Sequence, residues 1–387
     1  MKILHITPTY FPAVRYGGPI FAVHGLCSGL VRLGHEVHVY TTNVDGPENS
    51  AVPLDRDVEK DGVRIRYFPC GPVRKVYYAP ALKEAVMRNI HDFDMVHLQA
   101  IFIWTTWMAG RIAKNNHKPY VLSLHGTLDP DLIIRRHQCH KQVWLKLFDE
   151  YTLKHASGIH ATSNLEAQKL NTCVVCRGKI FVVPNGYSGN SAEENVLQSG
   201  KVPAELSRYD QFVLFLGRIH PIKGLDRLIQ ALSLVPRAVL VIAGNDENGY
   251  QAVLEKLIVA VRVQDRVFFT GPVYGRQKEE LLRRAVLFVM PSYSESFGSS
   301  VLEAMAQGCP VVVTPQVGLA ETVKREGCGV VTDGDPENLG RCLRELLQNP
   351  EALAAMGEKG KIVAEQQFDW KIIAQSMVCH YERLLNR

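Results

Sequence analysis

The chain has 387 residues, of which 46% are hydrophobic, and it carries 44 Lys plus Arg against 39 Asp plus Glu. This is ordinary globular composition, which excludes fibres, disordered tails and small disulfide-stapled scaffolds. A chain of this length usually divides into two domains. The basic excess lies in the first half, because residues 1–190 hold 22 basic and 15 acidic side chains. That bias favours an anionic partner without choosing among a phosphorylated ligand, an acidic membrane surface and nucleic acid.

The nine cysteines are an odd number and lack the spacing of a disulfide framework. The first residues, Met1 to Pro8, form no signal-peptide core, and no apolar run is long enough to span a membrane. We therefore expect a cytoplasmic protein with reduced thiols. Cys173-Val-Val-Cys176 has the spacing of half a zinc or redox site, but no second pair accompanies it, so no metal is expected.

Short apolar runs alternate with amphipathic stretches in the first half of the chain. Lys2 to Thr7 and Glu36 to Thr42 are expected strands, and Pro19 to Leu33 between them has a helical apolar stripe. Further strands are expected at 63–68, 95–98, 120–124, 158–161 and 180–183, with helices at 81–89 and 105–115. Strands that alternate with helices predict a largely parallel sheet, which binds ligands at the carboxyl ends of its strands.

The alternation stops in a polar stretch, which we interpret as a linker at 191–210. It resumes with strands expected at 211–216, 238–243, 267–270, 287–290 and 310–314, and helices at 224–234, 250–260, 278–285 and 300–307. Asp335-Pro-Glu is a good helix start. The pattern predicts two Rossmann-like domains at 1–190 and 211–368, followed by a final amphipathic helix at 369–387 that packs across the domains.

Gly17 and Gly18 stand before the first expected helix. Two glycines there allow backbone amides to approach an anion, although a plain turn explains the pair equally well. No G-x-G-x-x-G follows a strand and no Walker lysine motif occurs. Nicotinamide chemistry and P-loop hydrolysis are therefore disfavoured.

The second half carries the stronger signals. Arg218 and Lys223 lie on a glycine-bounded loop between a strand and a helix, where they can converge on a diphosphate or remain two solvated charges. Glu295 follows a strand, and Glu303 lies within the helix opened by Gly298. Because Glu303 has apolar neighbours, burying it is costly unless hydroxyls or a cation pair with it. We therefore predict that Glu303 is a ligand carboxylate.

These residues resemble the glycosyl transferases group 1, the retaining GT-B-fold glycosyltransferases of family 4. Glu295 and Glu303 reproduce the E-x7-E motif within its pattern E-x-F-G-x4-E-A-x-A-x-G-x-P-V-V. The resemblance extends in order over essentially the whole chain. It implies an α/β fold of the GT-B type, with two Rossmann-like domains facing a central cleft and a C-terminal helix that crosses back to the first domain.

The resemblance also implies roles. Arg218 and Lys223 would stabilise the departing diphosphate of the donor, and Glu303 would hold its ribose. Glu295 would hold hydroxyls of the transferred sugar, and His125, beside Gly126, would face that sugar from the first domain.

Further donor contacts are implied at Gly17 and Gly18 and at the backbone amides around Phe297 and Gly298. The donor would be a UDP- or GDP-sugar used without a cofactor or a metal. Three D-x-D triplets, at 55–57, 129–131 and 333–335, can hold a metal in other proteins but arise easily by chance. Asn185-Gly186 matches a family turn, whereas Tyr187-Ser188 departs from it.

A stretch from Arg135 to Phe148 combines basic residues (Arg135, Arg136, Lys141 and Lys146) with Trp144, Leu147 and Phe148. It suits contact with an anionic membrane or an ordinary surface helix, and both interpretations stay open. The resulting hypothesis is a retaining, metal-independent glycosyltransferase that acts on a glycan or polyprenyl-linked acceptor in bacterial surface-polysaccharide biosynthesis, with no nucleic-acid partner. The alternatives are a GT-B-fold nucleotide-sugar epimerase and a non-catalytic nucleotide-sugar-binding module.

Overall fold

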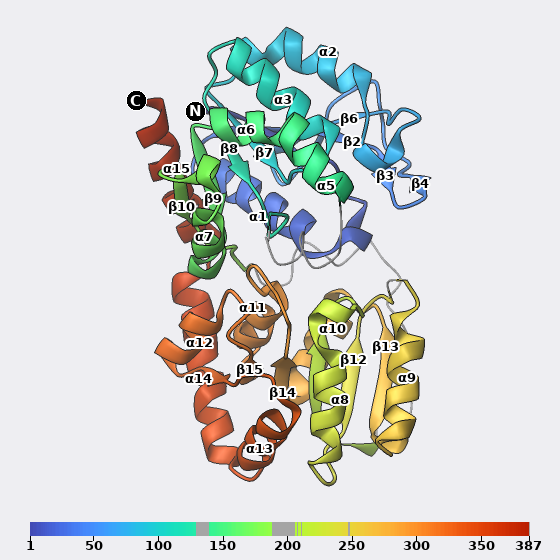
Figure 1. Cartoon of the computed structure of the whole chain (residues 1–387). Helices are drawn as coiled ribbons and strands as arrows, with labels where there is room; N and C mark the ends of the chain where they lie inside the picture. The colour runs from blue at the N-terminus through green and yellow to red at the C-terminus, as the bar shows by residue number, and fades with distance from the viewer. Residues whose placement is uncertain (129–138, 188–205, 207, 210, 247, 387) are drawn as a thin grey trace. The chain divides into compact units, whose positions relative to one another are not determined.

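The computed structural model describes residues 1–128, 139–187, 206, 208, 209, 211–246 and 248–386. The chain forms two compact units (Figure 1). Unit 1 comprises Met1–Gly186 and Trp370–Arg387, and unit 2 comprises Tyr187–Asp369. The chain therefore leaves unit 1 once and returns to it for the last helix. Most of the linker expected at 191–210 lies outside the described residues.

Unit 1 is built on an eight-stranded sheet with the order β10-β9-β8-β7-β1-β2-β6-β5, in which only the β5–β6 pair is antiparallel. Its strands are β1 (Lys2–Ile6), β2 (Glu36–Thr42), β5 (Val58–Lys60), β6 (Val63–Phe68), β7 (Met95–Gln99), β8 (Tyr120–Ser123), β9 (Gly158–Ala161) and β10 (Ile180–Val182). A small hairpin joins β3 (Val44–Asp45) to β4 (Glu48–Asn49).

The helices of unit 1 are α1 (Gly18–Arg32), α2 (Pro80–Asn89), α3 (Trp104–Asn115), α5 (Cys139–Trp144), α6 (Glu150–His155), α7 (Asn164–Asn171) and α15 (Trp370–Leu385). Single turns are η1 (Val14–Tyr16), η2 (Arg74–Val76), η3 (Ile90–Asp92), the π turn η4 (Leu145–Asp149) and η5 (Val174–Cys176). Alternation along the strands decides which side chains meet which helices. Leu4 and Ile6 of β1 join a cluster with Leu82 of α2 and Met108 of α3, whereas His97 of β7 points to the other face and contacts Tyr381 of α15.

Helix α15 packs closely on α1. A Cβ atom on Gly25 of α1 would lie 2.1 Å from the Trp370 ring, so only a residue without a side chain admits this contact. One turn later Gly29 lies against the Trp370 backbone and Ala374. The last helix thus belongs to unit 1 through contacts that are far apart in sequence.

Unit 2 contains a six-stranded parallel sheet with the order β13-β12-β11-β14-β15-β16. Its strands are β11 (Phe212–Leu216), β12 (Leu240–Ala243), β13 (Val267–Gly271), β14 (Ala285–Met290), β15 (Val311–Val313) and β16 (Gly329–Val331). Its helices are α8 (Leu225–Ser233), α9 (Tyr250–Ala260), α10 (Gly275–Arg284), α11 (Ser299–Ala306), α12 (Ala320–Glu326), α13 (Pro336–Leu347) and α14 (Pro350–Gln367), with the single turns η7 (Pro221–Lys223) and η8 (Gln264–Arg266). Both faces of the sheet are buried, because Leu214 and Val213 of β11 belong to two different apolar clusters.

Most expected elements are found, with ends that differ by three residues or fewer, and the strands at 36–42, 63–68 and 158–161 have the expected bounds. Asp335 caps α13 as predicted, since its Oδ1 accepts from the N–H groups of Glu337 and Asn338 at 3.0 and 3.3 Å. Helices α6, α7, α12 and α14 and strands β3, β4, β5 and β16 were not among the expected elements. For α7 a signal was present, because Ser163 accepts from the Glu166 N–H in the manner of a capping box.

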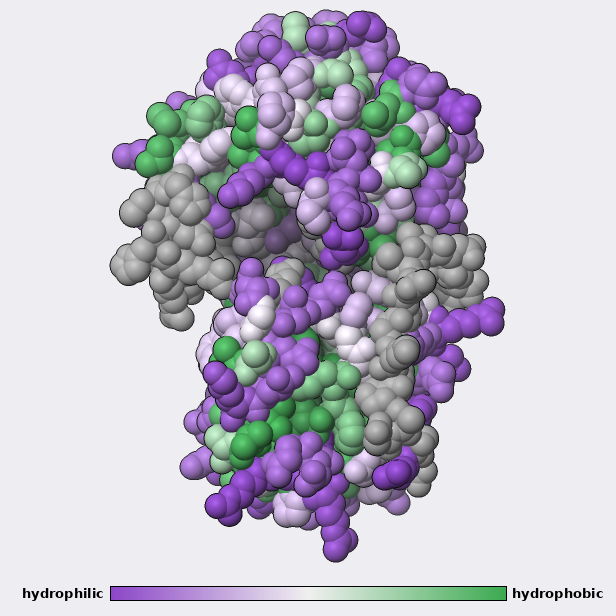
Figure 2. Space-filling view, turned by 90° about the vertical axis from the view of Figure 1, so that its right-hand side faces the viewer, coloured by the Kyte–Doolittle hydropathy of each residue, from purple (hydrophilic) through white to green (hydrophobic). Residues whose placement is uncertain are grey.

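The face drawn in Figure 2 is mixed, with its largest group of hydrophobic side chains on unit 2 and smaller groups on unit 1. On α9, Val253 and Val259 are 56% and 65% exposed. Among the described residues, no helix combines the length and the apolar character needed to cross a membrane.

Candidate functional site

Two loops of unit 2 meet at the carboxyl ends of β11 and β14. The first contains η7, and the Tyr293 N–H of the second donates to the Ile222 oxygen of the first at 2.8 Å. Gly224 ends the first loop with φ +70°, and a Cβ atom there would lie 2.0 Å from the Pro291 oxygen. Glycine is required here both for the left-handed backbone and for the close approach of the two loops.

Arg218 and Lys223 both lie on the first loop. The Arg218 side chain is exposed, and the next residue, Ile219, donates its N–H to the Asn245 oxygen at 2.8 Å. Lys223 ends η7, whose first turn is capped by His220 through its Nδ1 atom. The loop is therefore tied at both ends, and its two cations lie at the carboxyl edge of the sheet.

Lys223 forms an ion pair with Glu295 of the second loop. Its Nζ donates to Glu295 Oε2, and the two side chains are only 12% and 17% exposed. The Glu295 backbone is held on both sides, because its N–H donates to the Gln316 oxygen and its oxygen accepts from the Gly318 N–H, each at 2.9 Å. The Lys223 ammonium and the Glu295 carboxylate thus lie on two loops whose backbones are fixed by hydrogen bonds.

A second ion pair joins Glu303 of α11 to Lys278 of α10, with Lys278 Nζ 3.3 Å from Glu303 Oε2. The side chains are 24% and 14% exposed, respectively. A lysine thus offsets the cost of burying this carboxylate among apolar neighbours, and the role of Glu303 as a ligand carboxylate stays a prediction. We call Lys223–Glu295 and Lys278–Glu303 the two acid–lysine pairs.

Phe297 and Gly298 connect the second loop to α11. The Phe297 side chain is 3% exposed and lies against Phe368, with ring centroids 6.2 Å apart, so it belongs to the core of unit 2. Gly298 adopts φ +100° and caps α11. Any ligand contact from these two positions would come from the backbone.

In unit 1, Gly18 begins α1 and Gly17 is its N-cap residue with φ +69°. No side chain caps this helix start, and Gly18 is exposed. The Gly17 N–H already donates to the Val14 oxygen at 2.9 Å, and Pro19 has no N–H. The predicted anion contact at this helix start would therefore have to come from the Gly18 N–H.

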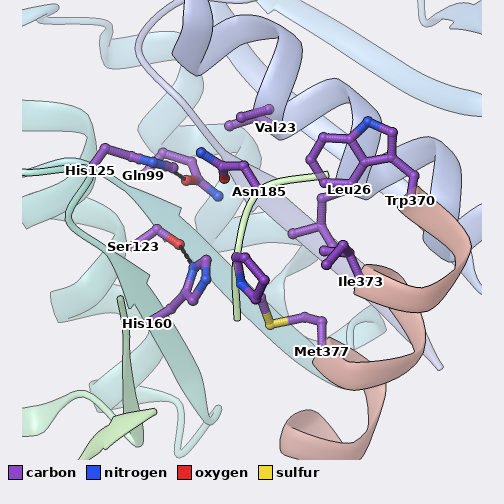
Figure 3. Close-up of a pocket in the computed structure, with 12 residues that line it drawn as sticks. Val23, Leu26, Gln99, Ser123, His125, His160, Asn185, Trp370, Ile373 and Met377 are labelled. Carbon is purple, nitrogen blue, oxygen red and sulfur yellow. Dashed lines mark hydrogen bonds between the residues drawn. The ribbon is translucent and has the colours of Figure 1, made fainter. Parts of the chain in front are cut away.

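His125 lies at the wall of a small pocket in unit 1, here called the histidine pocket (Figure 3). Gln99, Ser123 and His160 enter it from the carboxyl ends of neighbouring strands, and Trp370 of α15 lies opposite. His125 has φ +48°, and its Nε2 lies 2.7 Å from Gln99 Oε1. Since that oxygen can only accept, Nε2 carries the proton. Burial lowers the pKa of His125 to about 4, so the ring is neutral at pH 7.

The His125–Gly126 turn rests on a buried carboxylate. Glu166 is 3% exposed, and its Oε1 accepts from the Gly126 N–H at 2.6 Å. Its Oε2 accepts from the N–H and the hydroxyl of Thr162, both at 2.7 Å. These charge-assisted bonds fix the direction in which His125 projects.

A chain of hydrogen bonds beside the pocket connects Tyr381 to the Val183 oxygen. Tyr381 Oη lies 2.5 Å from His97 Nδ1, Ser123 Oγ lies 2.6 Å from both His97 Nε2 and His160 Nδ1, and His160 Nε2 lies 2.7 Å from the Val183 oxygen. One proton order satisfies every member, with each group donating to the next from Tyr381 to Val183. Burial lowers the pKa of His160 to about 3 and that of His97 well below its ordinary value.

The three D-x-D triplets do not converge on a metal site within the described part of the chain, where no group of three or more His, Cys, Asp or Glu side chains could hold an ion. Asp57 lies 3.6 Å from Arg66, and Asp333 accepts from the Asp335 N–H beside the cap of α13. The triplet at 129–131 lies outside the described residues.

Two family models match consecutive stretches of the chain. The model described as Glycosyltransferase Family 4 matches residues 16–188, and the one described as Glycosyl transferases group 1 matches residues 203–363. The chain is a glycosyltransferase. An uncharacterized glycosyltransferase of Methanocaldococcus jannaschii is 28% identical to this one, over 99% of this chain and 98% of its own.

A second relative and one solved structure are also similar to this chain. A D-inositol 3-phosphate glycosyltransferase of Xylanimonas cellulosilytica is 27% identical, over 100% of this chain and 97% of its own. Anabaena HepE, solved in complex with UDP-glucose, is 21% identical with a TM-score of 0.75, over 99% of this chain and 100% of its own. The expected α/β fold of the GT-B type, with two Rossmann-like sheets, is confirmed for this glycosyltransferase.

Three residues beside the expected ones were missed from sequence. Lys278 is a lysine on an amphipathic helix and resembles any solvated charge. Glu166 has a capping-box spacing, which explains a helix start but not its bond to Gly126. Gln99 follows His97 by two residues on β7, and this polar alternation in an otherwise apolar strand is the signal that could have revealed the pocket.

Proposed function

We propose that this glycosyltransferase retains anomeric configuration, needs no metal, and moves a hexose-type sugar from a nucleotide diphosphate donor to a glycan or lipid-linked glycan. Bacterial surface-polysaccharide biosynthesis is the proposed setting. The Lys223–Glu295 pair at the carboxyl ends of β11 and β14, with Arg218 on the same loop as Lys223, is the observation that carries the proposal. The UDP-glucose complex of HepE supports a nucleotide sugar as donor.

Arg218 and Lys223 are assigned to the diphosphate. An exposed guanidinium and a lysine on one braced loop can both donate to phosphate oxygens, and Arg218 can do so with two parallel bonds. Glu295 and the backbone at Phe297 and Gly298 would bind sugar hydroxyls, and Glu303 would bind the ribose. The Gly18 amide, next to Gly17 at the start of α1, would add a further anion contact.

The chemistry needs negative charge to be stabilised on the departing nucleotide. The bond between the anomeric carbon and the phosphate oxygen breaks, and the acceptor hydroxyl attacks from the face that the phosphate leaves. A leaving phosphate oxygen takes the acceptor proton. Arg218 and Lys223 would lower the barrier because their charge opposes the charge that develops on that phosphate.

The two glutamates are not assigned the roles of a glycosidase pair. Each carboxylate is held in an ion pair with a lysine ammonium. Their proposed work is to position hydroxyl groups, with each lysine holding its carboxylate in place.

His125 is assigned to the transferred sugar as a neutral hydrogen-bonding group. Its Nε2 proton is committed to Gln99, and its low pKa keeps the ring uncharged at neutral pH. A neutral, oriented imidazole can accept from a sugar hydroxyl through Nδ1. It would make a poor general acid, because its conjugate acid is scarcely populated at pH 7.

The deciding experiment is a panel of nucleotide sugars tested first by thermal shift and then for products with and without glycan acceptors. Binding raises the melting temperature by mass action. Transfer to an acceptor with the anomeric configuration unchanged by NMR supports the proposal. A new nucleotide sugar formed without acceptor would indicate an epimerase, and binding without turnover on any acceptor would indicate a binding module.

The ribose assignment has its own test. Glu303→Gln should weaken nucleotide binding in calorimetry, whereas the matched change Glu345→Gln at an exposed position on α13 should not. If nucleotide affinity is unchanged in folded Glu303→Gln, the assignment is wrong.

We further propose that the enzyme works on the cytoplasmic face of a membrane, to which unit 1 attaches peripherally. On α5 and η4, Val143 and Leu147 are 56% and 66% exposed, and Lys146 is exposed beside them. Trp144 and Phe148 instead pack together, with ring centroids 4.6 Å apart. The apolar and basic groups that remain on the surface suit an anionic lipid interface, where each cation contributes about 1 kcal/mol. Arg135 and Arg136 lie outside the described residues.

Liposome sedimentation tests this attachment. The chain should pellet with anionic vesicles at low salt, less so as salt screens the attraction, and little with neutral vesicles. Lys141→Glu with Lys146→Glu should release it, whereas the equal charge reversal Lys359→Glu with Lys361→Glu on α14 should not. A chain that stays in the supernatant with anionic vesicles at low salt would leave α5 as an ordinary surface helix and favour a soluble acceptor.

A further inference from the structure

Two cysteines of unit 1 that play no part in the proposed reaction flank a tight turn. Cys173 and Cys176 bracket η5, between α7 and β10, and the Cys176 N–H donates to the Cys173 oxygen at 3.0 Å. A turn closed in this way brings its first and fourth Cα atoms within about 7 Å. A disulfide spans Cα separations of about 4.4–6.8 Å, so the backbone already holds the pair at bridging range.

The two thiols differ in access. Cys176 is fully buried in the apolar cluster of unit 1, whereas Cys173 is half-buried and Val174 beside it is 72% exposed. A dissolved reagent can therefore reach Cys173 but not Cys176.

The two thiols also differ in reactivity. A hydrogen bond between the two sulfur atoms lowers the pKa of Cys173 and raises that of Cys176, and burial adds to the rise at Cys176. Cys173 is the more nucleophilic sulfur at neutral pH, because the thiolate is the attacking form.

We propose that Cys173 and Cys176 form a thiol–disulfide exchange site that reacts with small dissolved disulfides of the glutathione type. The Cys173 thiolate attacks one sulfur of the small disulfide, the S–S bond breaks, and one glutathione leaves and takes up a proton. Cys176 then loses its proton and attacks the Cys173 sulfur, releasing the second glutathione as a thiol. Two protein thiols are oxidised to one disulfide, and one small disulfide is reduced to two thiols.

This arrangement differs from that of the buried cysteines and of the exposed Cys379. Cys27, Cys309 and Cys328 are buried, and burial raises the pKa of each. Cys379 on α15 is exposed, and none of the other cysteines shares its segment of sequence. It is the matched control, because glutathione can attach to it but no neighbouring thiol follows in the chain to displace it.

The experiment exposes the full chain to glutathione disulfide, traps free thiols with an alkylating reagent, and maps the peptides by mass spectrometry. In the wild type, the 173–176 peptide should lose two hydrogens and retain no glutathione, while Cys379 keeps one glutathionyl group. In Cys176→Ser the adduct on Cys173 should persist, and in Cys173→Ser the thiol of Cys176 should stay reduced. Circular dichroism checks that both variants are folded.

Two results would overturn the proposal. One is a stable glutathione adduct on Cys173 in the wild type, which would show that Cys176 cannot displace it. The other is a pair that remains two thiols under conditions that modify Cys379, which would show that Cys173 is not an accessible nucleophile. A disulfide that forms and is reversed by reduced glutathione supports it.

Discussion

Unit 1 should lose stability as the pH falls from 7 to about 5.5, because it buries several histidines in the neutral form. Burial lowers the pKa of His5 and His160 to about 3 and that of His97 well below its ordinary value. In the unfolded chain these rings titrate near 6.5, so the unfolded state binds more protons throughout this window. The free energy of unfolding therefore rises with pH here and falls on acidification.

The magnitude follows from the same pKa values. A histidine that stays neutral when folded loses about 1.3 kcal/mol of stability between pH 7 and about pH 5.5. With His125, whose pKa is about 4, the four rings together lose about 5 kcal/mol. Asp149 opposes them, because burial raises its pKa to about 7 and the folded state takes up a proton in this window. That uptake returns about 1.6 kcal/mol, which leaves a net loss of about 3 kcal/mol.

Urea unfolding followed by tryptophan fluorescence measures this loss for unit 1 alone. The four tryptophans of the chain are at positions 104, 107, 144 and 370, all within unit 1. Asp149→Asn keeps an oxygen for the Phe102 N–H but removes the opposing proton uptake, so its loss should grow to about 5 kcal/mol. His160→Gln should reduce the loss by about 1.3 kcal/mol. If the free energy of unfolding stays constant or rises on acidification, the conclusion that these buried histidines are neutral is wrong.

The remaining predictions concern the reaction and its support. Arg218→Ala and Lys223→Met should each raise the activation barrier by about 2.7–4 kcal/mol, a loss of about 10²–10³ in turnover. If saturating donor restores full turnover, the two residues only bind the donor and do not stabilise the transition state. Activity should persist in a chelator, because these cations supply the positive charge; loss that magnesium or manganese reverses would revive the D-x-D triplets. Gly224→Ala should weaken nucleotide binding and destabilise unit 2 by at least roughly 1–2 kcal/mol, the cost of a left-handed backbone for a residue with a side chain. If calorimetry finds both the stability and the nucleotide affinity unchanged, the described loop geometry is wrong. Gln99→Leu leaves the His125 proton without its acceptor, so stability should fall by about 1–3 kcal/mol and turnover should fall while donor affinity holds; a fall in affinity alone would contradict the positioning role.

Much of the fold and part of the site could be predicted from local sequence patterns. Apolar periodicity is a property of neighbouring residues, so the strand at 63–68 and the cap at Asp335 were predictable from short windows of sequence. The same holds for Arg218 and Glu295, whose place after a strand puts them at the carboxyl edge of a parallel sheet before any contact is known. A spacing of eight residues likewise places Glu303 inside the helix that follows Glu295.

The pairings were decided by tertiary structure, because they join residues that no local pattern relates. Glu303 meets Lys278 only because α10 and α11 are neighbours in unit 2. Gln99 reaches both His125 and His5 because β8 and β1 flank β7 in the sheet. The histidines have low pKa values because α15, the last helix of the chain, covers the face on which they lie and excludes water from them. The sequence by itself determined which residues end strands and begin helices, whereas strand order and the packing of α15 on α1 decided which charges pair and which rings are buried.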